Sequence, residues 1–260
     1  MKIINMRGEE EPFSYRKVFN SARRVGASKE VAQKIAVEIE KNVYSGMKTL
    51  EIFKQVKLLL HKDNPASALK FNLKQAMRRL GPTGFPFEKY IGRIFEELGY
   101  QVKINQIIKG ECVSYEIDFL GQKDTILKVG ECKYRNLANS RVHTNDILIN
   151  QSRFLDVKQG GKLKGNLKTI LVTNTKFTKR AINYAKCKDI ELLGWRYPLN
   201  LGLEKIIDQY KLYPVTILPS LNKNTKDLLI AKNIVLAKDV LVDKIQGIDK
   251  LKREAEILLG

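Results

Sequence analysis

The 260-residue sequence predicts a three-layer α/β domain with a mixed sheet, preceded by a small, mainly helical domain and followed by a short helical region. Helix-like and strand-like segments alternate over residues 81–200 in the order α-β-β-β-α-β-α-β, which is typical of helices packed on both faces of a sheet. Residues 1–80 show helical spacing of apolar residues, and clusters of helix-breaking residues separate the parts near 80–86 and 195–202. The expected domains are residues 1–80, 84–198 and 201–260.

In the first domain, four helices are expected behind one short strand. Val31, Ile35 and Ile39 recur at intervals of four, and Ser28 can cap the helix that contains them. A third helix begins after Thr49, and a fourth runs from about residue 65 to residue 80.

The second domain opens with an amphipathic helix over residues 86–98 that ends at Gly99. Alternating strands and helices follow, with turn residues between them. The expected strands are 100–108, 113–120, 125–134, 167–173 and 190–195, and the expected later helices are 146–157 and 179–186.

The last sixty residues have helical spacing in three short segments. A turn at Gly247 between two helical patterns resembles half of a helix-hairpin-helix, a motif that binds nucleic-acid backbones, although Asp249 stands where that motif has its second glycine. Because this region carries a net charge of only +2, the preferred interpretation is a helical appendage for packing or dimerisation.

The charge of the chain indicates its kind of partner. The 47 Lys and Arg residues exceed the 28 Asp and Glu residues by 19, and residues 1–80 and 81–200 carry +9 and +8 of this excess. Such a field favours polyanions, because bound phosphates release counterions. Nucleic acid is the leading partner, and an acidic membrane surface is the alternative.

The composition disfavours other classes. No run approaches the roughly 18 apolar residues of a membrane span, and the first residues turn polar too soon for a signal peptide, so a cytoplasmic protein without membrane association is expected. Cys112, Cys132 and Cys187 are widely spaced, which supports neither a disulfide framework nor a structural zinc site.

Charged residues lie inside two of the expected strands. Alternation places Glu116 and Asp118 on one face of their strand. It places Ile117 and Phe119 on the other face. Carboxylates that project from a covered sheet cost desolvation unless they line a cleft or bind a ligand.

Glu131 and Lys133 share a face of the next strand in the same way. Carboxylate oxygens from two neighbouring strands suit Mg²⁺, which keeps its remaining positions for water and phosphate oxygens. Such a site can polarise a phosphodiester, and a neighbouring Lys can orient the attacking water.

The spacing of these residues resembles the PD-(D/E)xK nuclease superfamily, in which an Asp is followed across a hairpin by Glu-x-Lys. Asp118 and the run Glu131-Cys132-Lys133 match this pattern, with twelve residues between Asp118 and Glu131.

Within that superfamily the chain resembles the Mrr-type restriction endonucleases most. That branch places a Glu in the helix before the sheet, matched by Glu88, and ends this helix with Leu-Gly-Tyr, matched by residues 98–100. Two departures are a Ser-Tyr-Glu-Ile-Asp run at 114–118 in place of Asp-Gly-Gly-Ile-Asp, and Glu131 in place of a Gln.

The resemblance implies a metal-dependent DNA endonuclease that hydrolyses phosphodiester bonds to 5′-phosphate ends, in restriction, defence or DNA processing. The implied ligands of Mg²⁺ or Mn²⁺ are Glu88, Asp118 and Glu131. Lys133 would position the nucleophile, and Gln151 in the following helix would assist catalysis. Because cutting both strands calls for two active sites, a homodimer is expected.

Each of these residues also has a structural interpretation. Lys133 can pair with Glu131 on an exposed sheet face, and Gln151 can face solvent. Glu88 lies in the first turn of its helix, where the macrodipole favours a carboxylate. Glu116 is expected at the edge of the pocket, with a ligand role as the alternative.

Basic residues that follow the Glu-x-Lys strand are expected to contact phosphates. Some lie in the polar loop 135–145, where His143 is expected to be solvated, and others lie at the start of the next helix, whose N-terminus also attracts anions. These residues are Arg135, Arg141, Lys176, Lys179 and Arg180.

The first domain resembles the ATP-cone, a regulatory nucleotide-binding domain of ribonucleotide reductases and their repressors, at residues 3–8, 11–13, 15–18, 21–22, 32–36 and 38–40. The resemblance implies ATP or dATP as an effector, with Arg7, Arg16 and Lys17 as candidate phosphate-binding residues. Asn5 and Met6 stand where that family has a Lys-Arg pair. The alternative is a helical domain that adds basic surface or a dimer contact without binding ATP.

A second function remains open: a nucleotide-responsive DNA-binding regulator whose nuclease fold does not cut. The intact Asp118, Glu131 and Lys133 set favours the enzyme, because a protein that only binds DNA has no need of two carboxylates facing a polyanion.

Overall fold

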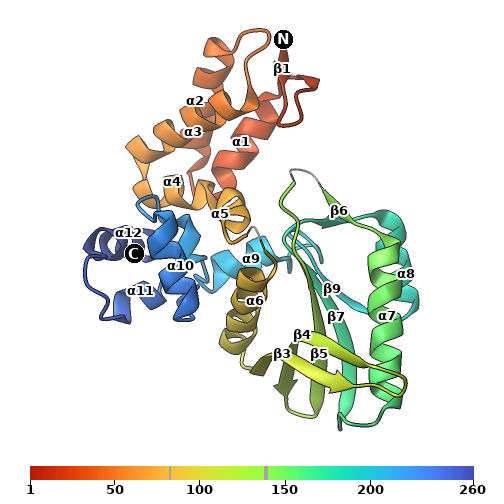
Figure 1. Cartoon of the computed structure of the whole chain (residues 1–260). Helices are drawn as coiled ribbons and strands as arrows, with labels where there is room; N and C mark the ends of the chain where they lie inside the picture. Colours follow the sequence, from red (N-terminus) through yellow and green to blue (C-terminus); the bar gives the residue numbers. More distant parts are fainter. Residues whose placement is uncertain (82, 138–139) are drawn as a thin grey trace. The chain divides into compact units, whose positions relative to one another are not determined.

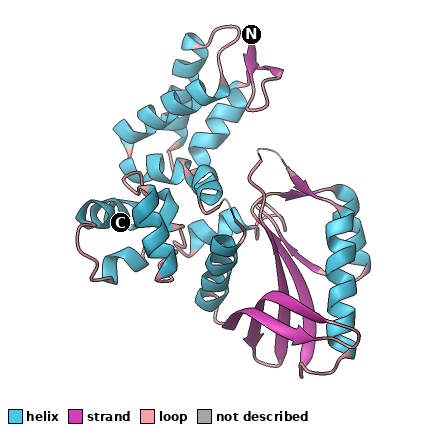
Figure 2. Ribbon diagram, in the orientation of Figure 1, coloured by secondary structure: helices cyan, strands magenta, loops and turns pink. Residues whose placement is uncertain are grey.

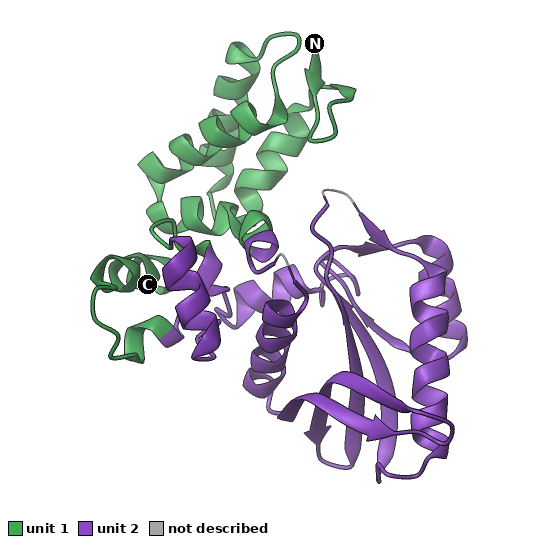
Figure 3. Ribbon diagram, in the orientation of Figure 1, with its two compact units in different colours: residues 1–76, 217–221, 240–260 green, residues 77–216, 222–239 purple. Residues whose placement is uncertain are grey.

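The computed structural model describes residues 1–81, 83–137 and 140–260 (Figure 1). Pro82 of the predicted domain junction and residues 138–139 of the predicted phosphate-binding loop lie outside the described residues. The chain forms two compact units (Figure 3). The first contains residues 1–76, 217–221 and 240–260, and the second contains residues 77–216 and 222–239. The segment 201–260 is therefore shared between both units and does not form a unit of its own.

The first unit is mainly helical, as predicted, and begins with a hairpin of two short strands where one was expected. Ser28 caps the second helix by accepting a hydrogen bond from the Val31 N–H, as predicted. The predicted fourth helix is broken at Asn72, whose N–H returns to the Leu69 carbonyl. The elements are β1 (Lys2–Ile4), β2 (Glu10–Pro12), α1 (Tyr15–Arg24), α2 (Lys29–Asn42), α3 (Thr49–Asp63), α4 (Pro65–Phe71), the first part of α5 (Leu73–Arg79), which continues into the second unit, and α12 (Asp249–Leu259).

One apolar cluster forms the core of this unit. It takes residues from the hairpin and from α1 to α4, and Ala22, Ala32, Ala36 and Leu60 are fully buried in it. The C-terminal helix α12 packs against α4, and Ser220 donates its backbone N–H to Glu254 of α12 at 3.1 Å. Segments from both ends of the chain thus complete a single unit (Figure 3).

The second unit is built on a mixed sheet, drawn in magenta in Figure 2. The sheet has five strands in the order β3-β4-β5-β7-β9. The first three strands are antiparallel, and β5, β7 and β9 are parallel. The predicted element order is confirmed, with an added two-stranded pair, β6 and β8. The elements are α6 (Phe85–Glu97), β3 (Gln101–Lys109), β4 (Ser114–Lys123), β5 (Ile126–Lys133), β6 (Arg141–Val142), α7 (Thr144–Gln159), β7 (Asn166–Thr173), β8 (Lys176–Phe177), α8 (Lys179–Cys187) and β9 (Glu191–Leu193).

Helices cover both faces of this sheet, with α6 on one face and α7 and α8 on the other (Figure 1). On the α6 face, Phe95 packs on Phe119 of β4 with ring centroids 4.7 Å apart. On the α7 face, Val157 joins Ile117 and Val129 in a second cluster. This is the predicted three-layer arrangement. Among the residues that the structure describes, no helix has the length and apolar character needed to cross a membrane.

The segments that follow the sheet support α6. The Tyr90 hydroxyl donates to the Leu212 carbonyl at 2.7 Å, and the Arg79 guanidinium donates to the Thr216 carbonyl at 3.0 Å. These contacts fix the helix that carries Glu88. The remaining elements are α9 (Leu203–Gln209), a 3-10 turn η1 (Val215–Ile217), α10 (Lys223–Ala231) and α11 (Asp239–Val242).

Candidate active site

The hairpin of β3 and β4 is kinked at its centre. Backbone pairing is regular at Ile104 with Phe119 and again at Gln106 with Ile117. Between these pairs Asn105 has a φ of 51°, a left-handed conformation that Asn tolerates better than most residues. Ile117 therefore lies on the α7 face, whereas Phe119 lies on the α6 face. The prediction that both residues share one face was wrong, because simple alternation does not allow for such a kink.

Asp118 lies at this kink, where β4 and β5 separate. The last backbone pair between these strands is Phe119 with Gly130. Beyond it, the Asp118 side chain accepts a hydrogen bond from the Cys132 N–H at 2.6 Å. The side chain thus replaces a strand partner, and its carboxylate is held beside the Glu-x-Lys segment.

Glu131 and Lys133 project from the same side of β5, as predicted, and form an ion pair. The Glu131 side chain is only 8% exposed, and its second oxygen lies 3.4 Å from the Arg153 guanidinium of α7. Both oxygens of this carboxylate therefore face a cation. Arg153 has no place in the sequence motif and was missed, because its role depends on how α7 packs on the sheet.

Glu88 reaches the same region from the first turn of α6. Burial, followed by the charges of Asp118, Glu116 and Glu131, raises the pKa of Glu88 to about 7. Burial and the charge of Glu131 also raise the pKa of Asp118 to about 6, although the Cys132 N–H opposes this shift. The negative charges of these predicted residues therefore act on one another, so their side chains lie in the same region.

The donor set fits a divalent cation in its chemistry. Four carboxylates face two cations, Lys133 and Arg153, so two negative charges remain uncompensated when all are ionised. Hard carboxylate oxygens suit Mg²⁺ or Mn²⁺. Glu88, Asp118 and Glu131 are the residues that would hold the ion, with Glu116 at the rim.

The oxygens of Glu88, Asp118 and Glu131 are not all close enough to one another to share one ion. Among the described residues, the one group of three acidic, His or Cys side chains with ligand atoms all within 4.8 Å of one another is Glu111, Cys112 and Asp156. Asp156 accepts hydrogen bonds there from the Cys112 N–H at 2.9 Å and the Val113 N–H at 3.4 Å. Asp156 therefore has a structural role, because these bonds hold the β3–β4 turn against α7. The Glu88, Asp118 and Glu131 oxygens must therefore move closer to one another to share an ion.

Tyr134 connects the Glu-x-Lys strand to the segment before α6. Its hydroxyl donates to the Arg78 carbonyl at 2.6 Å and accepts from the Gly81 N–H at 3.1 Å. Its ring packs on Phe87 with centroids 5.6 Å apart. A Cβ atom at Gly81 would lie 2.5 Å from the Tyr134 hydroxyl oxygen, so this close approach requires glycine.

Gln151 lies apart from these contacts. Its side-chain oxygen accepts a hydrogen bond from Tyr184 of α8, and it lines a cavity of about 290 Å³ on the α7 face. Lys158, Lys168 and Lys188 also line this cavity. The structure therefore does not bring Gln151 together with Glu131 through any contact among the described residues.

The predicted phosphate-binding residues lie mostly at the carboxyl ends of β5 and β7. The pairing of β6 with β8 places Arg141 opposite Lys176, and both side chains are exposed. Lys179 and Arg180 are exposed in the first turn of α8. Arg135 instead pairs with Asp146 at 2.9 Å. His143 is exposed and is the N-cap of α7, where its backbone N–H donates to the Asp146 carboxylate at 3.0 Å.

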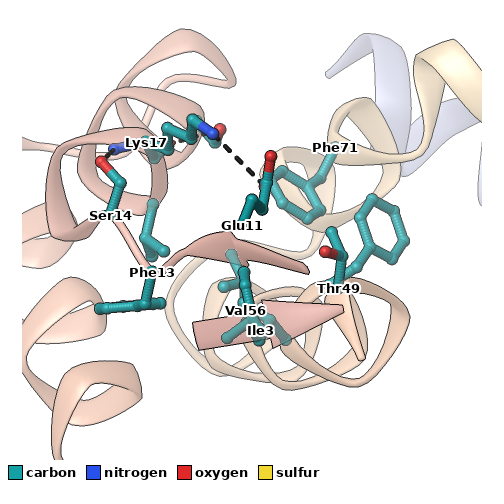
Figure 4. A pocket seen from close by; sticks show the side chains of 12 residues that line it. Ile3, Glu11, Phe13, Ser14, Lys17, Thr49, Val56 and Phe71 are labelled. Carbon is teal, nitrogen blue, oxygen red and sulfur yellow. Dashed lines mark hydrogen bonds and ion pairs between the residues drawn. The ribbon is translucent and has the colours of Figure 1, made fainter. Parts of the chain in front are cut away.

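The first unit contains a separate cavity of about 240 Å³ (Figure 4). Its walls are largely apolar and include Ile3, Phe13 and Phe71, whereas Ser14, Thr49 and the Lys17–Glu11 ion pair at 3.3 Å add polar groups. Of the three predicted nucleotide-binding residues, Lys17 lines the cavity. Arg7 and Arg16 are not among its lining residues.

Comparisons with known proteins agree with this fold. Residues 81–195 match the family model described as "Restriction endonuclease", and residues 213–257 match the model "AF1548-like, C-terminal". An uncharacterized protein of Archaeoglobus fulgidus is 36% identical over 147 residues, which cover 56% of this chain and 80% of that protein.

Two solved structures are also similar. The crystal structure of AF1548, a protein of unknown function, superimposes with a TM-score of 0.57 and 32% identity over 68% of this chain and 95% of that chain. The MspJI restriction endonuclease in complex with a 27-mer oligonucleotide matches with a TM-score of 0.37 and 15% identity over 65% and 36% of the respective chains, a likeness too weak to bear on function.

The mixed sheet with helices on both faces, together with the matching family model, defines a domain with a restriction-endonuclease-like fold. This confirms the predicted class of fold for the second unit. The chain belongs to the AF1548-like family, and its similarity to AF1548 covers 68% of its length.

Proposed function

We propose that this protein is a metal-dependent DNA endonuclease. The observation that carries the proposal is the meeting of Glu88, Asp118 and Glu131 beside Lys133 where β4 and β5 separate, within a domain of the restriction-endonuclease type. Partly or fully buried carboxylates that repel one another inside a basic protein are best accounted for by a bound divalent cation.

Each side chain has a distinct task in this proposal. A bound Mg²⁺ would polarise the scissile phosphodiester and lower the pKa of a water molecule. Asp118 is held in place by the Cys132 N–H, so its free oxygen is preorganised as a ligand. Lys133 donates from its ammonium group to the attacking water or to the charge that develops on the phosphate. The exposed side chains of Arg141 and Lys176 contact the backbone of the bound DNA.

The test is incubation of the purified protein with supercoiled plasmid and Mg²⁺ or Mn²⁺. We expect nicked and linear products, and none with the Glu131→Gln, Lys133→Ala double variant. Lys188→Ala, which removes a cation on the α7 face, is the matched control and should cut like the wild type. Cleavage that persists in the double variant would refute the assignment. DNA binding without any metal-dependent cleavage would instead support the alternative, a regulator with an inactive nuclease fold.

We also propose that the first unit binds ATP or dATP as an effector in its cavity. The apolar walls suit a planar base, and Lys17 offers one cation at the mouth. Ser21→Phe would fill the cavity from α1. We expect this variant to lose ATP binding in calorimetry while it retains basal plasmid cleavage, and unchanged ATP binding would contradict the proposal.

A homodimer would supply two active sites for cutting both strands. Light scattering at the concentration of the cleavage assay tests this point. A monomer that makes double-strand breaks would rule the dimer out.

A further inference from the structure

Arg153 is the cation of this site that no motif assigns. Its guanidinium lies 3.4 Å from one Glu131 oxygen, while Lys133 pairs with the other oxygen. The Arg153 side chain is 40% exposed, whereas Glu131 is almost fully buried. Arg153 therefore contacts the buried carboxylate and also borders solvent.

The backbone of α7 holds Arg153 in a fixed position. One turn before it, Asn150 donates to the Thr169 hydroxyl of β7 at 3.1 Å. One turn after it, Asp156 accepts from the Cys112 N–H of the β3–β4 turn at 2.9 Å. Residues three apart lie on one face of a helix, so both anchors hold the face that carries Arg153 against the sheet. The Arg153 side chain extends from this anchored segment and is partly exposed to solvent.

A divalent cation and Arg153 compete for the same oxygen. A cation on Glu131 would repel a guanidinium a few ångströms away, and Lys133 already occupies the other oxygen. The separation of the acidic oxygens described above fits this competition, because both Glu131 oxygens already pair with a cation. Once displaced, an exposed guanidinium finds its best new partner in a phosphate, which it can bind through two parallel hydrogen bonds.

We propose that Arg153 moves from Glu131 to a backbone phosphate of the nucleic acid when a divalent cation binds, and so couples binding of the metal to binding of the substrate. This proposal rests on the nuclease function proposed above. It makes Arg153 a phosphate-binding residue of the metal-bound site, and a competitor of the metal in the free protein.

The first experiment is calorimetric titration with Mg²⁺ in the absence of DNA. Arg153→Ala should bind Mg²⁺ about two- to fivefold more tightly than the wild type, because a competing half-exposed ion pair is gone. Arg153→Lys, which keeps the charge, should stay close to the wild type. Lys158→Ala on the same helix is the matched control and should leave the affinity unchanged. If Arg153 merely supported the shape of the site, its removal would weaken Mg²⁺ binding, and that result would overturn the proposal.

The second experiment measures binding of a fluorescent DNA duplex in EDTA, where no cleavage occurs. Glu131→Gln should tighten DNA binding, because it frees Arg153 and also removes a negative charge. The same substitution in an Arg153→Ala background should tighten binding about tenfold less, since the charge effect remains but the freed guanidinium does not. In a Lys158→Ala background, Glu131→Gln should tighten DNA binding as much as it does in the wild-type protein. An equal effect in all three backgrounds would overturn the proposal.

These measurements separate the two proposals. A protein that shows this coupling but never cuts plasmid would support the role of Arg153 and refute the nuclease. A protein that cuts without the coupling would retain the nuclease and refute the role of Arg153.

Discussion

The carboxylate of Asp118 accepts a hydrogen bond from the backbone N–H of Cys132 at 2.6 Å, across the point where β4 and β5 stop pairing. One carboxylate oxygen thus has a structural task, and the other is left to bind a ligand. The two tasks can be separated by substitution, because a carboxamide oxygen also accepts a hydrogen bond.

Asp118→Asn should keep this bond and abolish metal binding, with a stability equal to or above that of the wild type because a repelled charge is removed. Asp118→Ala should lose both the hydrogen bond and metal binding. Because the Cys132 N–H is then unpaired, the free energy of unfolding should fall by about 1–3 kcal/mol. Urea unfolding and Mg²⁺ calorimetry on both variants check this. Equal stability of the two variants would show that the hydrogen bond contributes nothing.

Glu88 should make the metal-free protein sensitive to pH. Its pKa rises from 4.5 to about 7 on folding, chiefly through burial. Because the folded pKa lies above the unfolded one, its stabilising contribution is complete below about pH 4.5 and is lost as the pH rises through 7. Glu88→Gln should therefore raise the melting temperature at pH 8, and the gap to the wild type should close at pH 5. If the difference in melting temperature did not change with pH, the pKa of Glu88 would not be raised in the folded protein.

Metal binding should show the opposite dependence on pH. A ligand carboxyl must lose its proton to bind, so Mg²⁺ affinity should rise between pH 6 and pH 8 and protons should be released at pH 6. Calorimetry in two buffers of different ionisation enthalpy measures this release. Mg²⁺ binding without proton release at pH 6 would mean that Glu88 and Asp118 are not ligands.

Tyr134→Phe should loosen the start of α6. It keeps the ring that packs on Phe87 but leaves the Gly81 N–H without its acceptor, at a cost of about 1–2 kcal/mol in the free energy of unfolding. Because α6 carries Glu88, Mg²⁺ affinity should fall as well. Tyr184→Phe is the control, since it also removes one tyrosine hydroxyl from the second unit. Equal Mg²⁺ affinity in both variants would show that this link does not position Glu88.

Gln151 should be dispensable for cleavage. Its side chain bonds Tyr184 on the α7 face, so Gln151→Ala should cut plasmid at the rate of the wild type. The comparison is made at saturating Mg²⁺ and DNA. A loss of rate of tenfold or more would instead place Gln151 in the catalytic set, as the resemblance to the nuclease superfamily implies.

Local patterns of apolar and turn residues predicted much of the second unit. The order of strands and helices, and the shared side of Glu131 and Lys133, followed from local patterns. The separate faces of Ile117 and Phe119 did not, because a single left-handed residue at Asn105 reverses the alternation and Asn occurs in many other conformations.

Local sequence patterns could not predict contacts between residues that are far apart in the sequence. Arg153 was an ordinary helical cation in the sequence, and its contact with Glu131 depends on the distance between α7 and β5. The break of the predicted fourth helix at Asn72 shows the same limit, since helical spacing continues on both sides of the turn. Likewise, nothing local indicated that residues 201–260 would be shared between two units.

That sharing bears on how the protein is made by the ribosome. Helix α4 emerges early, but its partner α12, with Leu251, Ala255 and Leu258 buried, is synthesised only after almost all of the second unit. Until α12 is synthesised, the apolar face of α4 that it covers stays exposed, whereas all strands of the sheet in the second unit have already been made. An interrupted translation product would therefore carry a formed sheet and an incomplete first unit, and would be a ready target for chaperones and proteases.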